Sequence, residues 1–288
     1  MTLVLQLLIN GLVVGGLLAV VALGLALIFG VMRVVNFAHG EFVTFGAYLT
    51  WLIAGQLGLP PLLGVPLSFL VGAALGWAIQ ALLISRVATR PSLDMLMVTY
   101  ALSALGLGMF SLVFGGDFRS YSTGPSGDLK LLGASIGLRS LAVLCVCAAL
   151  AAGVLLLLRS ARIGLALRAV AQNRDAAASS GIDVRRTERI TFSLAVGLAS
   201  AAGSLVSLIG TTTPTVGHDL VLDAFVVVVV GGLGSLPGAL LAALFIGLVQ
   251  SVCGFALDDG WAKIITYVLL YVALLLRPQG LFGQRAEA

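Results

Sequence analysis

Four polar residues, Arg33, Asn36, His39 and Glu41, lie between two stretches of almost unbroken apolar sequence. A neutral histidine can donate or accept a hydrogen bond, and a carboxylate near a helix N-terminus is favoured electrostatically. Polar side chains in such a setting usually mark a solute path. An alternative interpretation is that Asn36, His39 and Glu41 cap a helix that starts near Phe42 and hold its turn rigid, without touching solute. Both interpretations remain open.

A second interrupted region is the Gly- and Pro-containing run at 231–238. Together with the region 30–41 it gives one broken hydrophobic segment in each half of the chain, a pattern that points to the binding region of a transporter. Broken helices leave backbone groups that can bind the carboxylate or ammonium of a zwitterion, and these are tolerated at membrane depth only beside a cavity or inside protein. We therefore assign eight residues to the translocation path or its gate: Asn36, His39, Gly40, Glu41, Gly231, Gly232, Gly234 and Pro237.

The elements that must position these residues belong to a membrane protein. Of the 288 residues, 60% are hydrophobic and 10% are charged, and the mean hydropathy is +1.13. An average soluble domain carries about 25% charged residues, so a water-soluble fold is excluded. Because a crossing needs roughly 20 apolar residues, the chain is predicted to be an all-α, polytopic transmembrane helix bundle that forms a single domain over 1–288.

Apolar runs bounded by charges define the candidate crossings. Since the hydrocarbon offers no water to the backbone, each run is predicted to be helical, even the β-branched run 226–230. We expect nine crossings, with eight as the fallback because the run 221–235 is short and is interrupted at 231–238. The candidate spans are 3–29, 42–59, 61–85, 95–114, 140–158, 190–210, 221–235, 238–257 and 261–276.

The basic residues predict the orientation. Short cytoplasmic loops collect Lys and Arg, and the stretch 159–189 holds seven arginines, so it is placed inside. Alternation then puts twelve of the sixteen basic residues inside, with the N-terminus outside and the C-terminus inside, as an odd number of crossings requires. The other inside residues are Arg33, Arg86, Arg90, Arg277 and Arg285, and the outside residues are Arg119, Lys130, Arg139 and Lys263.

Several kinds of site are not indicated. The chain has no GxxxxGK[ST] phosphate loop, no HExxH zinc motif and no GxSxG elbow, so we expect no catalytic residue and no cofactor. Its three cysteines lie in apolar spans without zinc-site spacing, and we expect no metal. The net charge of +4 reflects the bias of the loops, and no basic patch alternates with aromatic residues as in nucleic-acid binding.

Two other classes of transport protein stay open, an ion-coupled secondary transporter working alone and a channel-like pore. An ion-coupled carrier normally has carboxylates buried in the middle of its spans. Here six acidic residues are predicted to fall near the ends of spans, which weakens that alternative: Glu41, Asp94, Asp219, Asp223, Asp258 and Asp259.

The segment 159–184 is the second informative feature. It is rich in Ala, and the sequence from Ser179 to Ile182 is typical of a helix end with Gly181 in the left-handed position. We expect a short cytoplasmic helix, because the segment is too polar for the bilayer and its small side chains would let a partner pack closely. The alternative is a solvated basic loop that only fixes the topology.

Five stretches in order along nearly the whole chain carry a family resemblance. They are 24–31, 36–41, 164–182, 230–239 and 277–283, of which Asn36 to Glu41 is the most specific. In these stretches the chain resembles the membrane permeases of branched-chain amino-acid ABC transporters, LivH type. The resemblance implies a multi-pass subunit of the bacterial inner membrane that forms half of a translocation pathway. Its cargo would be branched-chain or other hydrophobic amino acids, with urea or short amides as the alternative.

The resemblance also implies partners. These are a second, related permease that makes a heterodimer, two cytoplasmic ATPases that supply ATP hydrolysis in trans, and a periplasmic or extracellular solute-binding protein. In such proteins a cytoplasmic helix between spans fits a cleft on the ATPase, so the loop 159–189 is expected to couple hydrolysis to transport. The coupling positions carried over are Gly164, Arg168, Ala169, Asn173, Ala177 and Gly181.

Overall fold

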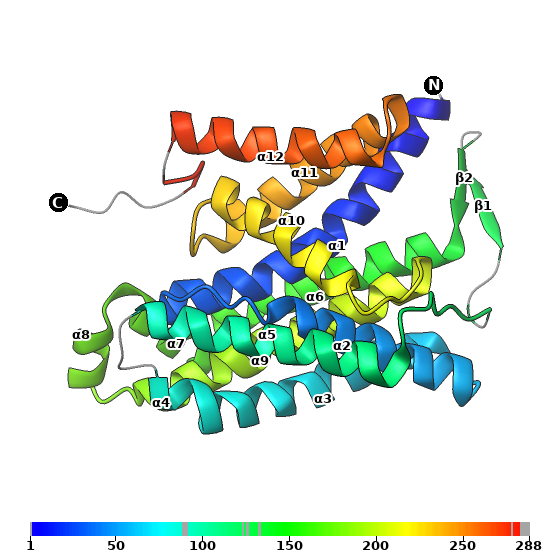
Figure 1. Ribbon diagram of the computed structural model, residues 1–288. Helices are drawn as coiled ribbons and strands as arrows, with labels where there is room; N and C mark the ends of the chain where they lie inside the picture. Colours follow the sequence, from blue (N-terminus) through cyan, green and yellow to red (C-terminus); the bar gives the residue numbers. More distant parts are fainter. Residues whose placement is uncertain are drawn as a thin grey trace.

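The computed structural model describes residues 2–87, 92–122, 124, 127–131, 134–277 and 279–282. Arg90, Pro278, Gly283 and Arg285, which took part in the expectations above, lie outside these ranges. Helices form one elongated bundle (Figure 1). In chain order the elements are α1 Thr2–Met32, α2 His39–Trp51, η1 Leu52–Gln56, η2 Pro61–Leu63, α3 Gly64–Ile79, η3 Gln80–Ile84, α4 Ser85–Val87, α5 Ser92–Phe114, β1 Asp128–Leu131, β2 Ala134–Gly137, α6 Leu138–Ser160, α7 Arg162–Gln172, α8 Arg174–Ser179, α9 Val184–Ile209, α10 Val216–Gly231, α11 Leu236–Ala256 and α12 Asp259–Leu276.

Each predicted span overlaps helical structure, including the β-branched run 226–230 within α10. Among the described residues, seven helical segments are long and apolar enough to cross a membrane, so the chain is a polytopic membrane helix bundle. The short helices α2, which η1 extends, and α10 are not among these seven, and the count of nine crossings stays a prediction. One departure is the hairpin of β1 and β2, which pair antiparallel from Asp128 opposite Gly137 to Leu131 opposite Ala134.

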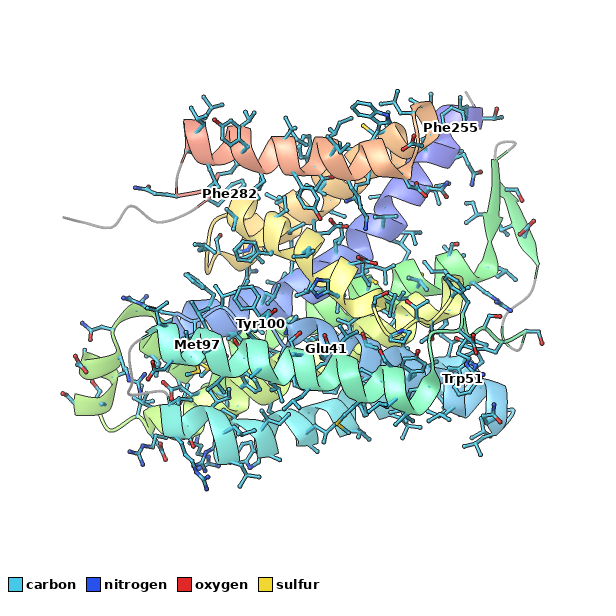
Figure 2. The ribbon with its side chains drawn as sticks, in the orientation of Figure 1. Glu41, Trp51, Met97, Tyr100, Phe255 and Phe282 are labelled. Carbon is cyan, nitrogen blue, oxygen red and sulfur yellow. The ribbon has the colours of Figure 1, made fainter. Side chains whose placement is uncertain are left out.

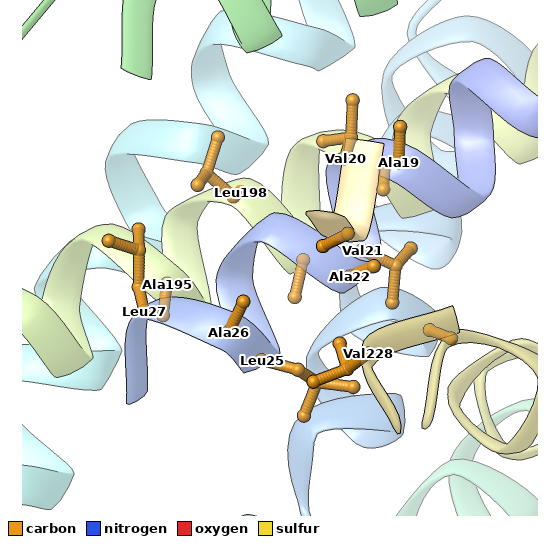
Figure 3. Close-up of a cluster of buried hydrophobic side chains, with 14 of the residues drawn as sticks. Ala19, Val20, Val21, Ala22, Leu25, Ala26, Leu27, Ala195, Leu198 and Val228 are labelled. Carbon is orange, nitrogen blue, oxygen red and sulfur yellow. The ribbon is translucent and has the colours of Figure 1, made fainter. Parts of the chain in front are cut away.

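The core of the bundle is formed by α1 and α9. A helix that is apolar all round is buried, and in α1 every residue from Gly15 to Ile28 is buried. Figure 3 shows Val20, Val21 and Ala22 of α1 among side chains of neighbouring helices, including Ala195 and Leu198 of α9. The outer helices α5 and α12 expose much of their apolar surface, as lipid-facing or partner-facing helices do.

Close glycine contacts hold the helices together, and Gly11/Gly15 and Gly72/Gly76 are pairs at four-residue spacing. A Cβ atom added to Gly11 would lie 2.8 Å from Leu248 Cα, and one added to Gly15 would lie 2.9 Å from the carbonyl oxygen of Ala243 in α11. A Cβ on Gly76 would lie 2.8 Å from Val196 Cβ in α9. Small residues at this spacing let helices approach within a membrane, where no hydrophobic effect drives association.

Hydroxyl groups add hydrogen bonds between α2, α3 and α9. Thr50 Oγ1 donates to Ser204 Oγ at 2.7 Å, and Ser204 Oγ lies 2.8 Å from Ser68 Oγ. All three side chains are buried. This network places the helix that carries the polar motif against the core.

The two ends of the bundle differ in composition. In Figure 1, α4, α7 and α8 lie at the left end, while the hairpin of β1 and β2 and the N-terminus lie at the right. The arginine-rich segment 159–189 is thus at the end opposite to the hairpin. Which of these ends faces the cytoplasm stays a prediction.

Candidate functional site

The polar motif begins in an irregular segment between α1 and α2. Arg33 has a left-handed backbone with φ of 55°, an uncommon conformation for a residue other than glycine, and it ends α1. Asn36 is only 2% exposed, and its Oδ1 accepts a hydrogen bond from the Ala38 backbone N–H at 3.1 Å. Asn36 therefore holds the turn before α2, and its Nδ2 has no partner among the described residues.

The capping interpretation is wrong for His39 and Glu41. The helix begins at His39 rather than near Phe42, and its N-cap residue Ala38 makes no side-chain cap. Both His39 and Glu41 lie within the first turn of α2 and are buried in the bundle. Their side chains therefore serve contacts with other helices.

His39 fixes α2 against the middle of α1. Its side chain is fully buried, and Nε2 lies 3.2 Å from the carbonyl oxygen of Val21. Because a carbonyl only accepts, the ring donates through Nε2. A Cβ atom on Gly24 would lie 2.8 Å from His39 Cε1, so glycine makes room for the ring. His39 is thus a positioning residue, closed off from any open path in this conformation.

Glu41 connects α2 with α5. It is 6% exposed, and its Oε1 accepts a hydrogen bond from Ser103 Oγ at 3.0 Å. Its Oε2 has no hydrogen-bond partner among the described residues. A Cβ on Gly106, one turn beyond Ser103, would lie 2.9 Å from Glu41 Cγ. Figure 2 shows Glu41 beside α5, on which Tyr100 and Met97 are labelled.

Gly40 places α10 beside the same motif. A Cβ atom on Gly40 would lie 2.6 Å from the carbonyl oxygen of Gly217, and the backbone N–H of Gly217 donates to Thr44 Oγ1 at 3.1 Å. The next residue, His218, is exposed and within electrostatic range of Glu41. Helices α2, α5 and α10 therefore meet around one carboxylate. Sequence reasoning missed Ser103, Gly106 and Gly217, since single small residues in apolar helices give no signal.

The run 231–238 forms a tight loop between α10 and α11. Gly232 and Gly234 have φ of 106° and 82°, which glycine adopts without strain. Ser235 caps α11 by accepting a hydrogen bond from the N–H of Gly238 at 3.2 Å, and Pro237 lies in the first turn. The conformation of the loop is therefore determined by its own glycines and by the Ser235 cap.

The carbonyl groups at the end of α10 have hydrogen-bond donors within the protein. The backbone N–H groups of Leu281 and Phe282 donate to the carbonyl oxygens of Val230 and Gly231, at 2.9 and 3.1 Å. In this conformation the C-terminal segment supplies both donors. Whether these broken-helix groups also bind a zwitterion is not tested by these bonds, and the assignment of Gly231 to the path stays a prediction.

The two broken regions do approach each other, at Gly30 and Gly234. A Cβ on Gly234 would lie 3.3 Å from Gly30 Cα. A cavity of about 270 Å³ lies beside them, between the ends of α1 and α6, helix α7 and the start of α11, with Gly234 and Pro237 in its wall. None of Asn36, His39, Gly40 and Glu41 lines it. The predicted path residues thus divide into a group around Glu41 and a group at the end of α1.

The segment 159–184 contains two helices rather than the single one expected. Asn173 leaves the helical conformation, with φ of −152° and ψ of 111°, and its Oδ1 caps α8 by accepting from the N–H groups of Asp175 and Ala176, each at 3.0 Å. The predicted helix end is confirmed, because Gly181 has φ of 83° and the N–H of Ile182 donates to the carbonyl oxygen of Ala177 at 3.1 Å.

The six proposed coupling positions mostly shape this segment. Gly164 packs on the end of α6, where an added Cβ would lie 2.5 Å from the carbonyl oxygens of Leu157 and Leu158. Arg168 donates through Nη1 to the Leu158 carbonyl oxygen at 2.6 Å, and Ala177 is buried. Ala169 is half-buried, while Asn173 and Gly181 are exposed.

Other residues provide the outer surface and the anchor of the segment. Ile163 and Leu165 expose 39% and 60% of their surface on α7, and sequence reasoning missed these exposed apolar side chains. An ion pair between Arg174 Nη1 and Glu188 Oε1, 2.6 Å long, fastens α8 to α9. The segment is thus held firmly by the bundle and still presents apolar surface outward.

Asp223 corrects one expectation about the carboxylates. It was predicted near the end of a span, but it lies in the middle of α10, is 7% exposed, and accepts a hydrogen bond from Gln250 Nε2 at 3.4 Å. A buried carboxylate within a membrane helix is a functional candidate by default. Among the described residues, no group of three or more His, Cys, Asp or Glu side chains could hold a metal ion.

Comparisons with known proteins give a consistent answer. A family profile described as branched-chain amino acid transport system / permease component matches residues 7–274. The chain is 29% identical to the high-affinity branched-chain amino acid transport system permease protein BraD of Pseudomonas aeruginosa, over 97% of this chain and 96% of that protein. It is 28% identical to LivH of Escherichia coli over the same shares.

A solved structure has a similar fold. A chain of PsaBC from Streptococcus pneumoniae, in complex with Fab, superposes with a TM-score of 0.52 at 14% identity, over 95% of this chain and 92% of that one. At that identity the likeness concerns the fold alone.

Proposed function

This chain belongs to the family of branched-chain amino acid transport permease components, and on that premise we propose that it forms one half of the translocation pathway for branched-chain or other hydrophobic amino acids. It is a multi-pass protein of the inner membrane and the permease subunit of an ATP-binding-cassette importer. Its relatives are transport subunits rather than enzymes, and ATP hydrolysis is supplied by separate ATPase subunits.

The observation that carries the proposed mechanism is the way the segment α7–α8 is mounted. Gly164 and Arg168 fix α7 to the end of α6, and Arg174 fixes α8 to Glu188 of α9. The side chains of Ile163 and Leu165, on either side of Gly164 in the chain, are exposed. An ATPase that binds the exposed surface of the segment α7–α8 would move the ends of α6 and α9. It would thereby favour one of two bundle conformations that differ in affinity for the solute.

We place the gate where α2, α5 and α10 meet. Glu41 is held by Ser103 on one side and approached by His218 on the other, while Asn36, His39 and Gly40 fix the position of α2. A carboxylate with one unpaired oxygen in a buried setting attracts a hydrogen-bond donor such as an ammonium group. Movement of α5 relative to α2 would open this contact.

The assembly follows from the same premise. A second, related permease would complete the pathway, two ATPases would bind at the end that holds α7 and α8, and a solute-binding protein would bind at the end that holds the hairpin of β1 and β2. This orientation, with nine crossings, the N-terminus outside and the C-terminus inside, agrees with the arginine-rich end in Figure 1.

Co-expression tests the class of transporter. Uptake of radiolabelled leucine should require the second permease, both ATPases and the binding protein, and it should stop with vanadate. Uptake by this chain alone that collapses with the ion gradient would instead support an ion-coupled carrier, for which the buried Asp223 is the candidate residue. Competition by urea or short amides in the assembled system tests the alternative cargo.

Cysteine labelling tests the orientation. Ala176 is exposed on α8, so Ala176→Cys in a chain without its native cysteines should resist an impermeant maleimide in intact cells and react in inverted vesicles. Labelling in intact cells would place α8 outside and remove the basis of the coupling proposal. For the gate, full uptake by Asn36→Ala and Glu41→Ala variants at normal expression would contradict the assignment.

A further inference from the structure

A basic groove lies between α3 and the start of α9, away from both groups of path residues. It has a volume of about 440 Å³ and is lined by Trp77, Asp183, Arg185, Arg186 and Arg189. Figure 2 shows nitrogen-bearing side chains gathered at the end of the molecule that holds α4, α7 and α8. The groove is at this end, because α9 begins at Val184, just after α8.

The shape of the groove follows from how α3 and α9 pack. Further along α9 than the groove, the two antiparallel helices are in tight contact. Ser193 Oγ donates to the carbonyl oxygen of Ala73 at 2.7 Å, and Gly76 leaves room for Val196. One turn earlier in α9, at Arg189, large side chains take the place of the small ones. The groove lies at this level, beside Trp77.

The groove carries an unbalanced positive charge. Three guanidinium groups face one carboxylate, and Asp183 already accepts a hydrogen bond from the backbone N–H of Arg186 at 2.9 Å. The nearby Glu188 is paired with Arg174. Within the described part of the chain, no ion pair engages the side chains of the three arginines, and the Nε atom of Arg189 is buried without a partner. A buried N–H without an acceptor is costly, so an acceptor is expected there.

The position of the groove favours a lipid as the source of that acceptor. The apolar run of α9 begins at Ile190, directly after Arg189, which places the arginines where the span meets the headgroup region. Leu70 and Val71 of α3 are 63% and 41% exposed, as for a helix that faces lipid, and Trp77 is 41% exposed. Tryptophan is enriched at membrane interfaces.

We propose that this groove binds the phosphodiester headgroup of an anionic phospholipid such as phosphatidylglycerol. Arginine forks bind phosphate oxygens in a bidentate manner, and basic pockets between membrane helices on the cytoplasmic side bind anionic headgroups. Arg185, Arg186 and Arg189 hold the phosphate oxygens. The Arg189 side chain turns so that its Nε–H, which is covered in this conformation, also finds an acceptor, and Trp77 packs on the glycerol. The acyl chains run along the exposed face of α3.

The bound lipid would also stabilise the first turns of α9. Glu188 in these turns anchors α8 through Arg174, so the lipid would hold the base of the segment α7–α8 in place. The proposal itself requires only a membrane and is independent of the cargo and of the partner subunits.

The test uses the full chain in nanodiscs of phosphatidylcholine with or without phosphatidylglycerol. Native mass spectrometry should find phosphatidylglycerol retained by the wild type, and its thermal midpoint should rise with that lipid. In R185Q/R186Q/R189Q the affinity should fall roughly tenfold to 100-fold, since each arginine contributes to the attraction. The control R33Q/R162Q/R277Q removes the same charge from exposed arginines outside the groove and should retain the lipid.

A second variant keeps the proposal testable if R185Q/R186Q/R189Q does not insert correctly into the membrane. R185K/R186K/R189K keeps the positive charges that orient the span but lacks the guanidinium forks, and it should bind phosphatidylglycerol several-fold more weakly than the wild type. Equal retention by both groove variants and the wild type would overturn the proposal, as would equal loss in the control. Inorganic phosphate that stabilises the protein in neutral nanodiscs as well as phosphatidylglycerol does would show that the ligand is a free anion rather than a lipid.

Discussion

The contact between Gly40 and Gly217 gives the sharpest prediction about the site. In Gly40→Ala the new Cβ would lie 2.6 Å from the carbonyl oxygen of Gly217 and 2.9 Å from its carbonyl carbon, whereas real Cβ contacts are essentially never shorter than 3.0 Å. Both atoms belong to the backbone and no side chain can turn aside. Helices α2 and α10 must therefore move apart.

The size of the effect follows from that displacement. A separation of about 0.5 Å or more is needed, which would stretch the 3.1 Å hydrogen bond from the N–H of Gly217 to Thr44 Oγ1 beyond useful length. Overpacking costs about 1–3 kcal/mol, and a lost interhelical hydrogen bond in a membrane about 0.6 kcal/mol. At roughly 2–4 °C per kcal/mol, we expect the thermal midpoint to fall by about 3–14 °C.

The assay compares Gly40→Ala with Gly108→Ala. Gly108 lies in α5, and an added Cβ there has nothing within 4 Å, so that alanine should be neutral or slightly stabilising. Thermal unfolding of the purified chain and leucine uptake by the assembled transporter are measured for both. Because Gly40 adjoins Glu41, uptake should fall more than stability alone explains. Thermal midpoints within about 1 °C of each other, together with equal transport, would refute the reasoning from this contact. The calculated fall is well above this difference.

Three further predictions concern the segment α7–α8 and the core. Asn173→Ala removes the cap of α8 at a cost of about 1 kcal/mol, so hydrogen exchange of 174–180 should accelerate, while Asn173→Asp should preserve the cap; unchanged exchange in Asn173→Ala would contradict this. Gly181→Ala strains a residue with φ of 83°, so the same amides should exchange faster than in Gly181→Asn. Ser204→Ala breaks the bonds to Thr50 and Ser68 and should cost about 0.6–2 kcal/mol, measured as a lower thermal midpoint; a midpoint equal to that of the wild type would argue against the network.

The helices could be predicted from the sequence because the solvent, more than local propensity, decides them. In hydrocarbon every backbone group must be paired within the segment, so the valine run of α10 is helical although it resembles a strand. The helix end at Gly181 was also predictable, since it depends on residues adjacent in the chain. The break at Asn173 had a signal that was missed, because Asn is a strong N-cap residue.

The contacts of the polar motif could not be predicted in the same way. The bond from His39 to Val21 depends on where the irregular segment after Arg33 returns along α1. The meeting of Glu41 with Ser103 depends on how α5 lies across α2. The apolar run of a helix determines neither its tilt nor its rotation, because packing against its neighbours sets both. The hairpin of β1 and β2 was missed because the alternation of polar and apolar residues in Asp128–Leu131 covers only four residues.

A continuous series of contacts leads from the end that holds α8 to the motif around Glu41. Arg174 of α8 is paired with Glu188 of α9, and further along α9 Ser204 is hydrogen-bonded to Thr50 of α2. Gly203 packs directly on the α2 backbone beside Val43, two residues from Glu41. By contrast, a cavity of about 270 Å³ lies between α7, the end of α1 and the start of α11. Close-packed contacts transmit a displacement and a cavity absorbs it, so α9 is the element through which a movement of α8 would reach Glu41.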